Sequence, residues 1–140
     1  MERWLDRNAS HFYSLLRLMA GVMFAMHGAQ KIFGAFGGRR VTGDPLMTLA
    51  GVIELVAGTL IAVGLLVRPA AILASGEMAV AYFKAHAPQG FLPIVNRGEL
   101  AVLYSFLFLF FAAYGAGSLS LLRLLRPRPR TAGSEPLPAS

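Results

Sequence analysis

The chain has 140 residues, of which 56% are hydrophobic and 14% are charged, whereas an ordinary soluble domain has roughly 25% charged residues. Its 13 Lys and Arg against 7 Asp and Glu give a formal net charge of +6. So few charged side chains cannot cover a water-soluble surface of this size, which disfavours a soluble enzyme and indicates a membrane chain. Because the sequence contains no cysteine, disulfides, thiolate metal cages and dithiol redox relays are excluded within it.

Four apolar stretches, each near the length that crosses a bilayer, follow one another along the chain. They cover residues 12–33, 46–67, 69–86 and 100–122. The last stretch carries no formal charge and is rich in Leu, Phe and Ala, which makes it the clearest predicted span. The pattern predicts an all-α integral membrane protein, a four-helix bundle formed by residues 1–126.

Glycine and proline mark the connections between the predicted helices. Residues 34–45 hold four glycines and a proline, which is typical of a polar loop. The pair Arg68-Pro69 predicts a tight joint, so the second and third helices should form an antiparallel hairpin. Residues 87–98, rich in proline and glycine, cannot continue a helix. Residues 127–140 lack apolar side chains for a core, and we expect them to form a disordered tail.

The distribution of basic residues predicts the orientation in the membrane. Four spans place both termini on one side, and the side with more Lys and Arg is normally cytoplasmic. The terminal side would carry Arg3, Arg7, Arg68, Arg123, Arg126, Arg128 and Arg130, and the other side Arg39, Arg40, Lys84 and Arg97. We therefore expect cytoplasmic termini. Topology and anionic lipid headgroups explain the basic excess, and no basic motif interleaved with aromatic residues points to nucleic acid.

Ionisable residues inside the predicted spans are the most informative, because a charge at a helix centre costs on the order of 2.5 to 3.5 kcal/mol on insertion scales. The first span carries a stripe of residues spaced three or four apart, which should face the bundle. The stripe consists of Arg17, Gly21, Phe24, Gly28 and Lys31, with His27 beside it. The later helices contribute one carboxylate each, namely Glu54, Glu77 and Glu99.

These groups admit two interpretations. In the first, buried ion pairs fix the order of the helices, with Arg17, Glu54 and Glu77 as candidates and Arg17 reaching one of the two acids. In the second, a polar pocket in the outer half of the bundle binds a polar head group or relays protons. Its candidate lining residues are His27, Lys31, Glu54, His86 and Glu99.

Metal or haem ligation by His27 and His86 with a carboxylate is a third alternative. The sequence has no close ligand pair such as His-x-x-x-His or Glu-x-x-His. We therefore predict no metal site and no intrinsic cofactor, and leave a quinone or a lipid as the expected ligand class.

In this order, the residues resemble the DoxX family of small bacterial membrane proteins over residues 16–120. The matching pieces are Arg17-Leu18, Gly21, Phe24, His27-Gly28, Lys31-Ile32-Phe33-Gly34, Gly51, Glu54, Gly58, Gly64-Leu65, Arg68-Pro69-Ala70-Ala71, Glu77-Met78, Ala81-Tyr82, His86, Asn96 and Gly98-Glu99. The resemblance implies a four-helix protein of the bacterial inner membrane whose relatives are linked with oxidoreductase systems, including thiosulfate:quinone oxidoreductase.

The family resemblance and the sequence together lead to an expected function. We expect an accessory or anchoring subunit of a membrane-associated, quinone-linked oxidoreductase system, in which a partner protein carries out electron transfer. Membrane lipids and an oxidoreductase protein are the expected partners, with a homo-oligomer as a further assembly to consider. The alternatives are a proton-coupled carrier of a small solute, or a membrane enzyme that uses His27, Glu54 and Glu99 on a lipid-soluble substrate.

Overall fold

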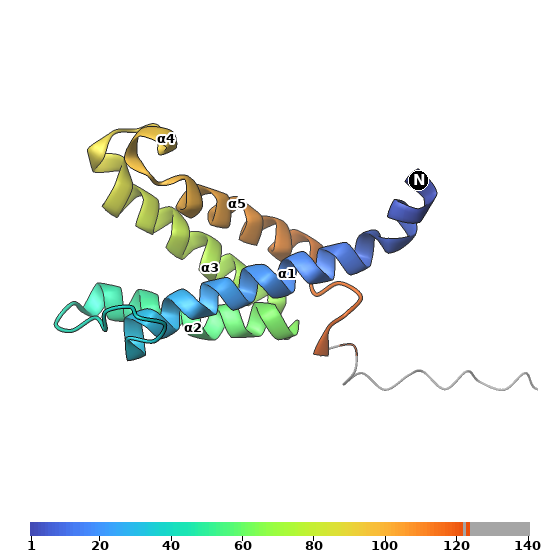
Figure 1. Cartoon of the computed structure of the whole chain (residues 1–140), viewed down its shortest axis with the longest axis horizontal. Helices are drawn as coiled ribbons and strands as arrows, with labels where there is room; N and C mark the ends of the chain where they lie inside the picture. Colours follow the sequence, from blue (N-terminus) through green and yellow to red (C-terminus); the bar gives the residue numbers. More distant parts are fainter. Residues whose placement is uncertain (122, 124–140) are drawn as a thin grey trace, which may run out of the picture.

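The structure is a computed structural model that describes residues 1–121 and 123, and these residues form helices and no strand. The long helices are α1 (Glu2–Phe33), α2 (Pro45–Val63), α3 (Val67–Ala81) and α5 (Glu99–Tyr114) (Figure 1). The α3 helix continues into a π-helix (Tyr82–His86) and a 3-10 turn (Ala87–Gln89), and α4 (Pro93–Asn96) is a single turn before α5. The predicted all-α class is confirmed. The predicted tail, 127–140, lies outside the described residues.

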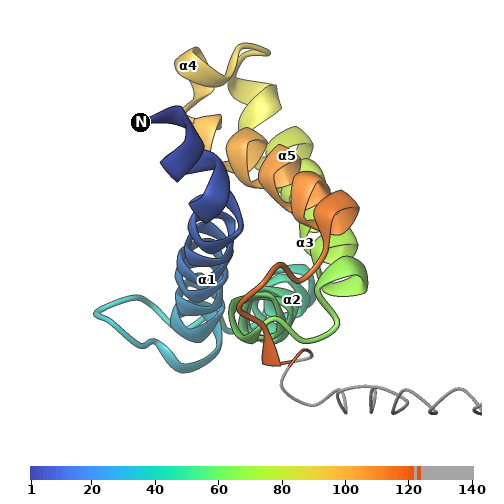
Figure 2. The same ribbon diagram turned by 90° about the vertical axis from the view of Figure 1, so that its right-hand side faces the viewer.

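The helices form two pairs that meet at one end and diverge at the other (Figures 1 and 2). The α1 helix packs along α2, and α3 packs along α5. We call the end around Gly64 and residues 115–120 the closed end, and the end around residues 34–45 and α4 the open end. The α2 and α3 helices are joined by a short turn, as the sequence predicts. These two helices contact each other, but each lies against a different partner along most of its length.

Close contact between α1 and α2 depends on glycines. A Cβ atom added to Gly21 would lie 2.5 Å from the backbone nitrogen of Ala62, and one added to Gly58 would lie 2.5 Å from that of Ala25. Gly28 faces the backbone nitrogen of Leu55 in the same way. A methyl group at any of these positions would force the two backbones apart, so the close contact requires glycine, as at other close helix crossings in membranes.

The helix ends differ from the predicted ones where backbone torsions become left-handed. The α2 helix ends at Val63 because Gly64 adopts φ 77°, and Leu66 at φ 49° turns the chain directly into α3. The predicted boundaries at residues 67 and 69 are therefore two to four residues late. The α5 helix ends at Tyr114, because Gly115 adopts φ 92° and Gly117 φ 74°. The prediction of a helix through residue 122 is wrong.

The segment 115–120 instead folds back and covers the closed end. The Tyr13 hydroxyl donates a hydrogen bond to the carbonyl of Gly115. The Leu119 amide donates to Ser14 Oγ at 3.2 Å, and the Ser118 hydroxyl donates to the Ser10 carbonyl at 3.1 Å. Each bond joins this segment to α1, so the chain beyond α5 continues across the bundle instead of along the helix axis.

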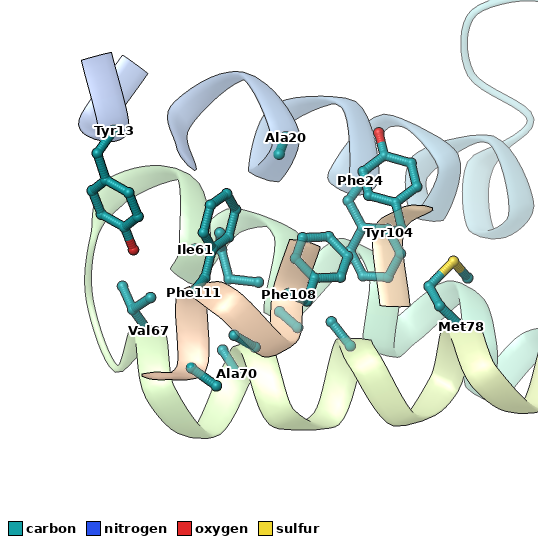
Figure 3. Close-up of a cluster of buried hydrophobic side chains, with 14 residues drawn as sticks. Tyr13, Ala20, Phe24, Ile61, Val67, Ala70, Met78, Tyr104, Phe108 and Phe111 are labelled. Atoms are coloured by element: carbon teal, nitrogen blue, oxygen red, sulfur yellow. The ribbon is translucent and has the colours of Figure 1, made fainter. Parts of the chain in front are cut away.

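An aromatic core fills the space between the helix pairs next to the closed end. Phe24 of α1 packs edge-on against Phe108 of α5, with ring centroids 4.7 Å apart, and Tyr104 stacks on Phe108 at 5.2 Å (Figure 3). Phe111 and Ile61 are also fully buried. This core holds the two pairs together where they meet.

Two of the described helices, α1 and α2, are long and apolar enough to cross a bilayer, judged by length and composition. The α5 helix is apolar but shorter. The outer surface carries exposed large apolar side chains on every long helix, for example Met23 on α1, Val56 on α2, Ile72 on α3 and Phe106 on α5. An apolar surface of this extent is typical of a protein that contacts membrane or other apolar partners.

Candidate functional site

The charged stripe of α1 faces the bundle, as its spacing predicts. Arg17, Gly21, Phe24 and Gly28 are buried, and Lys31 is partly buried. Its two cationic ends reach different environments: Arg17 lies at the closed end and Lys31 lies toward the open end. The two cations of α1 therefore belong to two different parts of the molecule.

The open end contains a cavity of about 900 Å³ between the two helix pairs. Its lining is mostly apolar and comes from α1, α2, α3, the π-helix and α5. Six charged side chains and two histidines also line it, namely His27, Lys31, Asp44, Glu54, Glu77, Lys84, His86 and Arg97. A concave, largely apolar site with a few polar groups is typical of a small-molecule binding pocket.

The inner part of the cavity holds an ion pair. Lys31 Nζ lies 2.6 Å from Glu54 Oε1, and it is the only ion pair between side chains of the described residues. The Glu54 side chain is 4% exposed and the Lys31 side chain 26%. A carboxylate this deeply buried needs a cation close by, and Lys31 at helical spacing from Gly28 supplies it.

Glu77 adds a second carboxylate to the same cavity. Its side chain lines the cavity together with Lys31 and Glu54. Glu77 Oε2 and Glu54 Oε2 are both buried and accept no hydrogen bond from any described residue. We call Lys31, Glu54 and Glu77 the charged floor of the cavity. With all three groups ionised, the floor has one excess negative charge.

The structure brings together four of the five predicted pocket residues. His27, Lys31, Glu54 and His86 line the cavity, whereas Glu99 does not. Glu99 is exposed in the first turn of α5, where a carboxylate interacts favourably with the helix dipole. His27 and Glu54 therefore share the cavity, and Glu99 lies outside its lining.

His86 is held by the loop that follows it. Its ring nitrogen Nδ1 donates to the carbonyl of Asn96 at 3.1 Å. The Asn96 side chain in turn donates to the Gly90 carbonyl at 2.6 Å and accepts from the Gly98 amide at 2.7 Å. The Tyr82 hydroxyl donates to the Phe91 carbonyl. These bonds give the irregular segment 87–98 a defined position at the mouth of the cavity.

Arg17 does not form the predicted ion pair with Glu54 or Glu77. Its guanidinium donates to the carbonyls of Ile61 and Ala62 at the end of α2, and to the Leu119 carbonyl at 2.6 Å. The last carbonyls of a helix have no partner within the helix, so a buried guanidinium can bind them. Sequence reasoning missed this role because it considered only acids as partners for Arg17.

Glu77 was predicted as an ion-pair residue, and the structure places it in the cavity without a cation of its own. Glu54 and Glu77 both lie near the middle of their predicted spans, but this shared depth does not show that Glu77 lines a cavity. No three His, Cys, Asp or Glu side chains of residues 1–121 and 123 are grouped as metal ligands would be.

These features define an all-α membrane protein with a charged cavity between two helix pairs. A family model described as DoxX matches residues 12–87, and the chain belongs to the DoxX family. It is 44% identical to a protein of Haemophilus influenzae described as uncharacterized, over 84% of this chain and 92% of that protein. It is 32% identical to an uncharacterized membrane protein of Mycobacterium tuberculosis, over 85% of this chain and 84% of that protein. No solved structure matches the chain.

Proposed function

We propose that this DoxX protein is an accessory or anchoring subunit of a membrane oxidoreductase system and that its open-end cavity receives a lipid-soluble ligand with a polar end. The observation that carries the proposal is the cavity itself, which combines apolar walls with the charged floor. Such a site fits a molecule with an apolar body and a polar end. Electron transfer is assigned to the partner protein.

The proposal includes a four-helix arrangement in the bacterial inner membrane. The α1 and α2 helices have sufficient length, and α3 with its π-helical continuation extends from Val67 to His86. At about 1.5 Å per residue, α5 is about 24 Å long, which a locally thinner bilayer accommodates at modest cost. Both termini are assigned to the cytoplasm on the basis of the arginine distribution.

The absence of cysteine makes this topology easy to test. Single cysteines introduced as Asp6→Cys and Arg39→Cys should differ in labelling by a membrane-impermeant maleimide applied to intact cells. We expect labelling of Arg39→Cys alone, and labelling of both after the membrane is permeabilised. Labelling of both variants in intact cells would refute the proposed topology.

The redox association is tested by purification from native membranes in a mild detergent, followed by identification of co-purifying proteins and extracted lipids. We expect a redox protein to be enriched. The variant Gly76→Trp should lose the bound lipid-soluble ligand and keep the partner, because Gly76 lines the cavity and an added Cβ meets no atom within 4 Å. Recovery of the chain with no redox protein would count against the proposal.

The unpartnered Glu77 beside the Lys31–Glu54 pair supports a second candidate, a proton-coupled carrier of a small solute. Carboxylates at this depth in membrane proteins commonly bind coupling ions or protons. Solute flux into proteoliposomes that is driven by a proton gradient and lost in Glu54→Gln would favour this candidate. Absence of flux across a broad panel of solutes would remove it.

A further inference from the structure

The charged floor carries unsatisfied hydrogen-bonding capacity that the proposed function does not explain. Glu54 and Glu77 line one cavity, and the Oε2 atom of each is buried and accepts no hydrogen bond from the described residues. Glu54 is more than nine-tenths buried. A buried acceptor without a donor costs about 1–3 kcal/mol, and more for a charged group. Two such oxygens in the same cavity indicate that a ligand supplies the donors.

The charge balance narrows the chemistry of that ligand. Lys31 pairs with Glu54, which leaves Glu77 as the carboxylate of the charged floor that has no ion-pair partner among the described residues. A ligand with a carbonyl or carboxylate head would add acceptors where acceptors are already unsatisfied. A primary ammonium brings three donors and one positive charge, and hydrogen bonds between ionised groups are the strongest available.

We propose that the open-end cavity binds an amphipathic primary amine, with its ammonium at Glu54 Oε2 and Glu77 Oε2 and its apolar body against the apolar walls. The walls are formed by residues such as Met47, Ile53, Leu73 and Ala101. The proposal rests on the proposed function only in using the same cavity. It replaces the general class of lipid-soluble ligands by one head-group chemistry.

Two molecules share this chemistry: a free lipophilic amine and the ethanolamine head of a phospholipid. The exposed Lys84 and Arg97 also line the cavity. Their charges oppose a lone cation, but they complement a phosphate that follows the amine in an ethanolamine head group. The ammonium site is common to both sources, and competition experiments distinguish them.

The test is a scintillation proximity assay with tritiated hexadecylamine and the full chain in phosphatidylcholine nanodiscs. Unlabelled hexadecylamine should compete. Hexadecanol has the same tail but no charge, and the hexadecyltrimethylammonium ion has the charge but no donor. Each should compete about tenfold less well, which corresponds to the loss of one hydrogen bond to a charged group. Equal competition by hexadecanol or by hexadecyltrimethylammonium would overturn the proposal.

Phosphatidylethanolamine added to the nanodiscs identifies the source. Competition by this lipid, with a matched amount of phosphatidylcholine as control, would support the head-group form of the proposal. Competition by hexadecylamine alone would support the free-amine form. Absence of saturable hexadecylamine binding would overturn both forms.

Amino-acid substitutions test whether the amine binds in the open-end cavity. Glu77→Gln should weaken amine binding about tenfold, since it removes the excess charge and one charge-assisted bond. Glu99→Gln, which changes a carboxylate outside the cavity, is the matched control and should leave binding unchanged. If Glu77→Gln does not fold, Gly76→Trp provides the readout, because its side chain enters open space and should abolish amine binding. Full amine binding by folded Gly76→Trp would overturn the proposal.

These results separate the ammonium proposal from the proposed function. If hexadecanol binds as well as hexadecylamine and Gly76→Trp abolishes both, the cavity binds lipid-soluble ligands and only the ammonium proposal fails. If the redox partner fails to co-purify while the amine binds, the accessory role fails and the ammonium site stands.

Discussion

The closed end and the open end of the molecule each contain a cationic side chain of α1, but the two cations have different kinds of partner. At the closed end, Arg17 is 2% exposed and bound by main-chain carbonyls. At the open end, Lys31 is 26% exposed and bound by a carboxylate. A guanidinium presents five donors in a planar fork, so it can satisfy several helix-end carbonyls at once, whereas an ammonium acts as a point charge.

The partners of Arg17 determine how many cations remain for Glu54 and Glu77. Since Arg17 binds carbonyls, it leaves Glu54 and Glu77 with one cation between them. The closed end is thereby sealed with its hydrogen bonds largely made, although Arg17 Nε is buried without a partner among the described residues. The open end keeps an accessible cavity and, among the described residues, a carboxylate without an ion-pair partner, Glu77. One end suits a structural role and the other a binding role.

The largest expected effect is at the closed end. Arg17→Ala should lower the free energy of unfolding by about 3 kcal/mol, because a hydrogen bond to a charged group contributes about 1.5–3 kcal/mol and several carbonyls lose their donor. Unfolding in mixed micelles, followed by far-UV circular dichroism, measures this loss. Arg39→Ala, in the exposed 34–45 loop, is the control and should have little effect. Equal stability of the two variants would contradict the sealed closed end.

The next effect concerns the glycines that bring α1 and α2 together. Gly28→Ala should cost about 2 to 3 kcal/mol, because its methyl group meets the α2 backbone and the helices must separate. Gly76→Ala has open space around it and should raise stability by about 0.5–1 kcal/mol through helix propensity. Thermal unfolding in detergent compares the two variants. A similar change in both would show that the close α1–α2 contact is unimportant.

At the open end we expect a smaller loss of stability, and the effects of substitutions at Lys31 and Glu77 should not be additive. Lys31→Met should cost about 1.5 kcal/mol, between the values for exposed and buried pairs, since Lys31 is partly exposed. Adding Glu77→Gln should recover part of this loss, because it removes the repulsion between two buried carboxylates. A double-mutant cycle measures the coupling. Strict additivity would show that Glu77 does not interact with the Lys31–Glu54 pair.

The smallest effect tests the segment that covers the closed end. Tyr13→Phe removes the hydroxyl that donates to the Gly115 carbonyl and should cost about 1 kcal/mol. Tyr114→Phe changes an exposed tyrosine next to the same turn and serves as the control. Limited proteolysis after residue 114 should be faster in Tyr13→Phe alone. Identical cleavage in both variants would argue against a role for this bond in holding segment 115–120.

Much of the fold could be predicted from local pattern. The spacing of Arg17, Gly21, Phe24 and Gly28 correctly identified the buried face of α1, since residues three and four apart share one side of a helix. Glycine and proline marked most of the connections. The end of α5 could not be predicted in this way. The sequence stays apolar past Gly115, but Gly115 and Gly117 adopt positive φ values that end the helix.

The candidate site was predicted in part. His27, Lys31 and His86 were predicted in one pocket because they share a depth toward one face of the membrane, and Glu54 because His27 and Lys31 could reach it; all four line the cavity. Glu99 was placed in the same pocket for the same reason and lies outside it, because depth does not determine the direction in which a helix presents a side chain. Glu77 lines the cavity because α3 diverges from α2 toward the open end. No local pattern in the sequence predicts this divergence.

Composition and helical periodicity are local properties, and they were enough to predict a helical membrane protein and the buried face of α1. The ordered series of residues along the chain was enough to place it in the DoxX family. The tertiary structure alone decided the partners of the buried charges. Those partners depend on the angle between the helix pairs and on the return of segment 115–120 to α1. Contacts of this kind join residues far apart in the chain, and the spacing of neighbours cannot specify them.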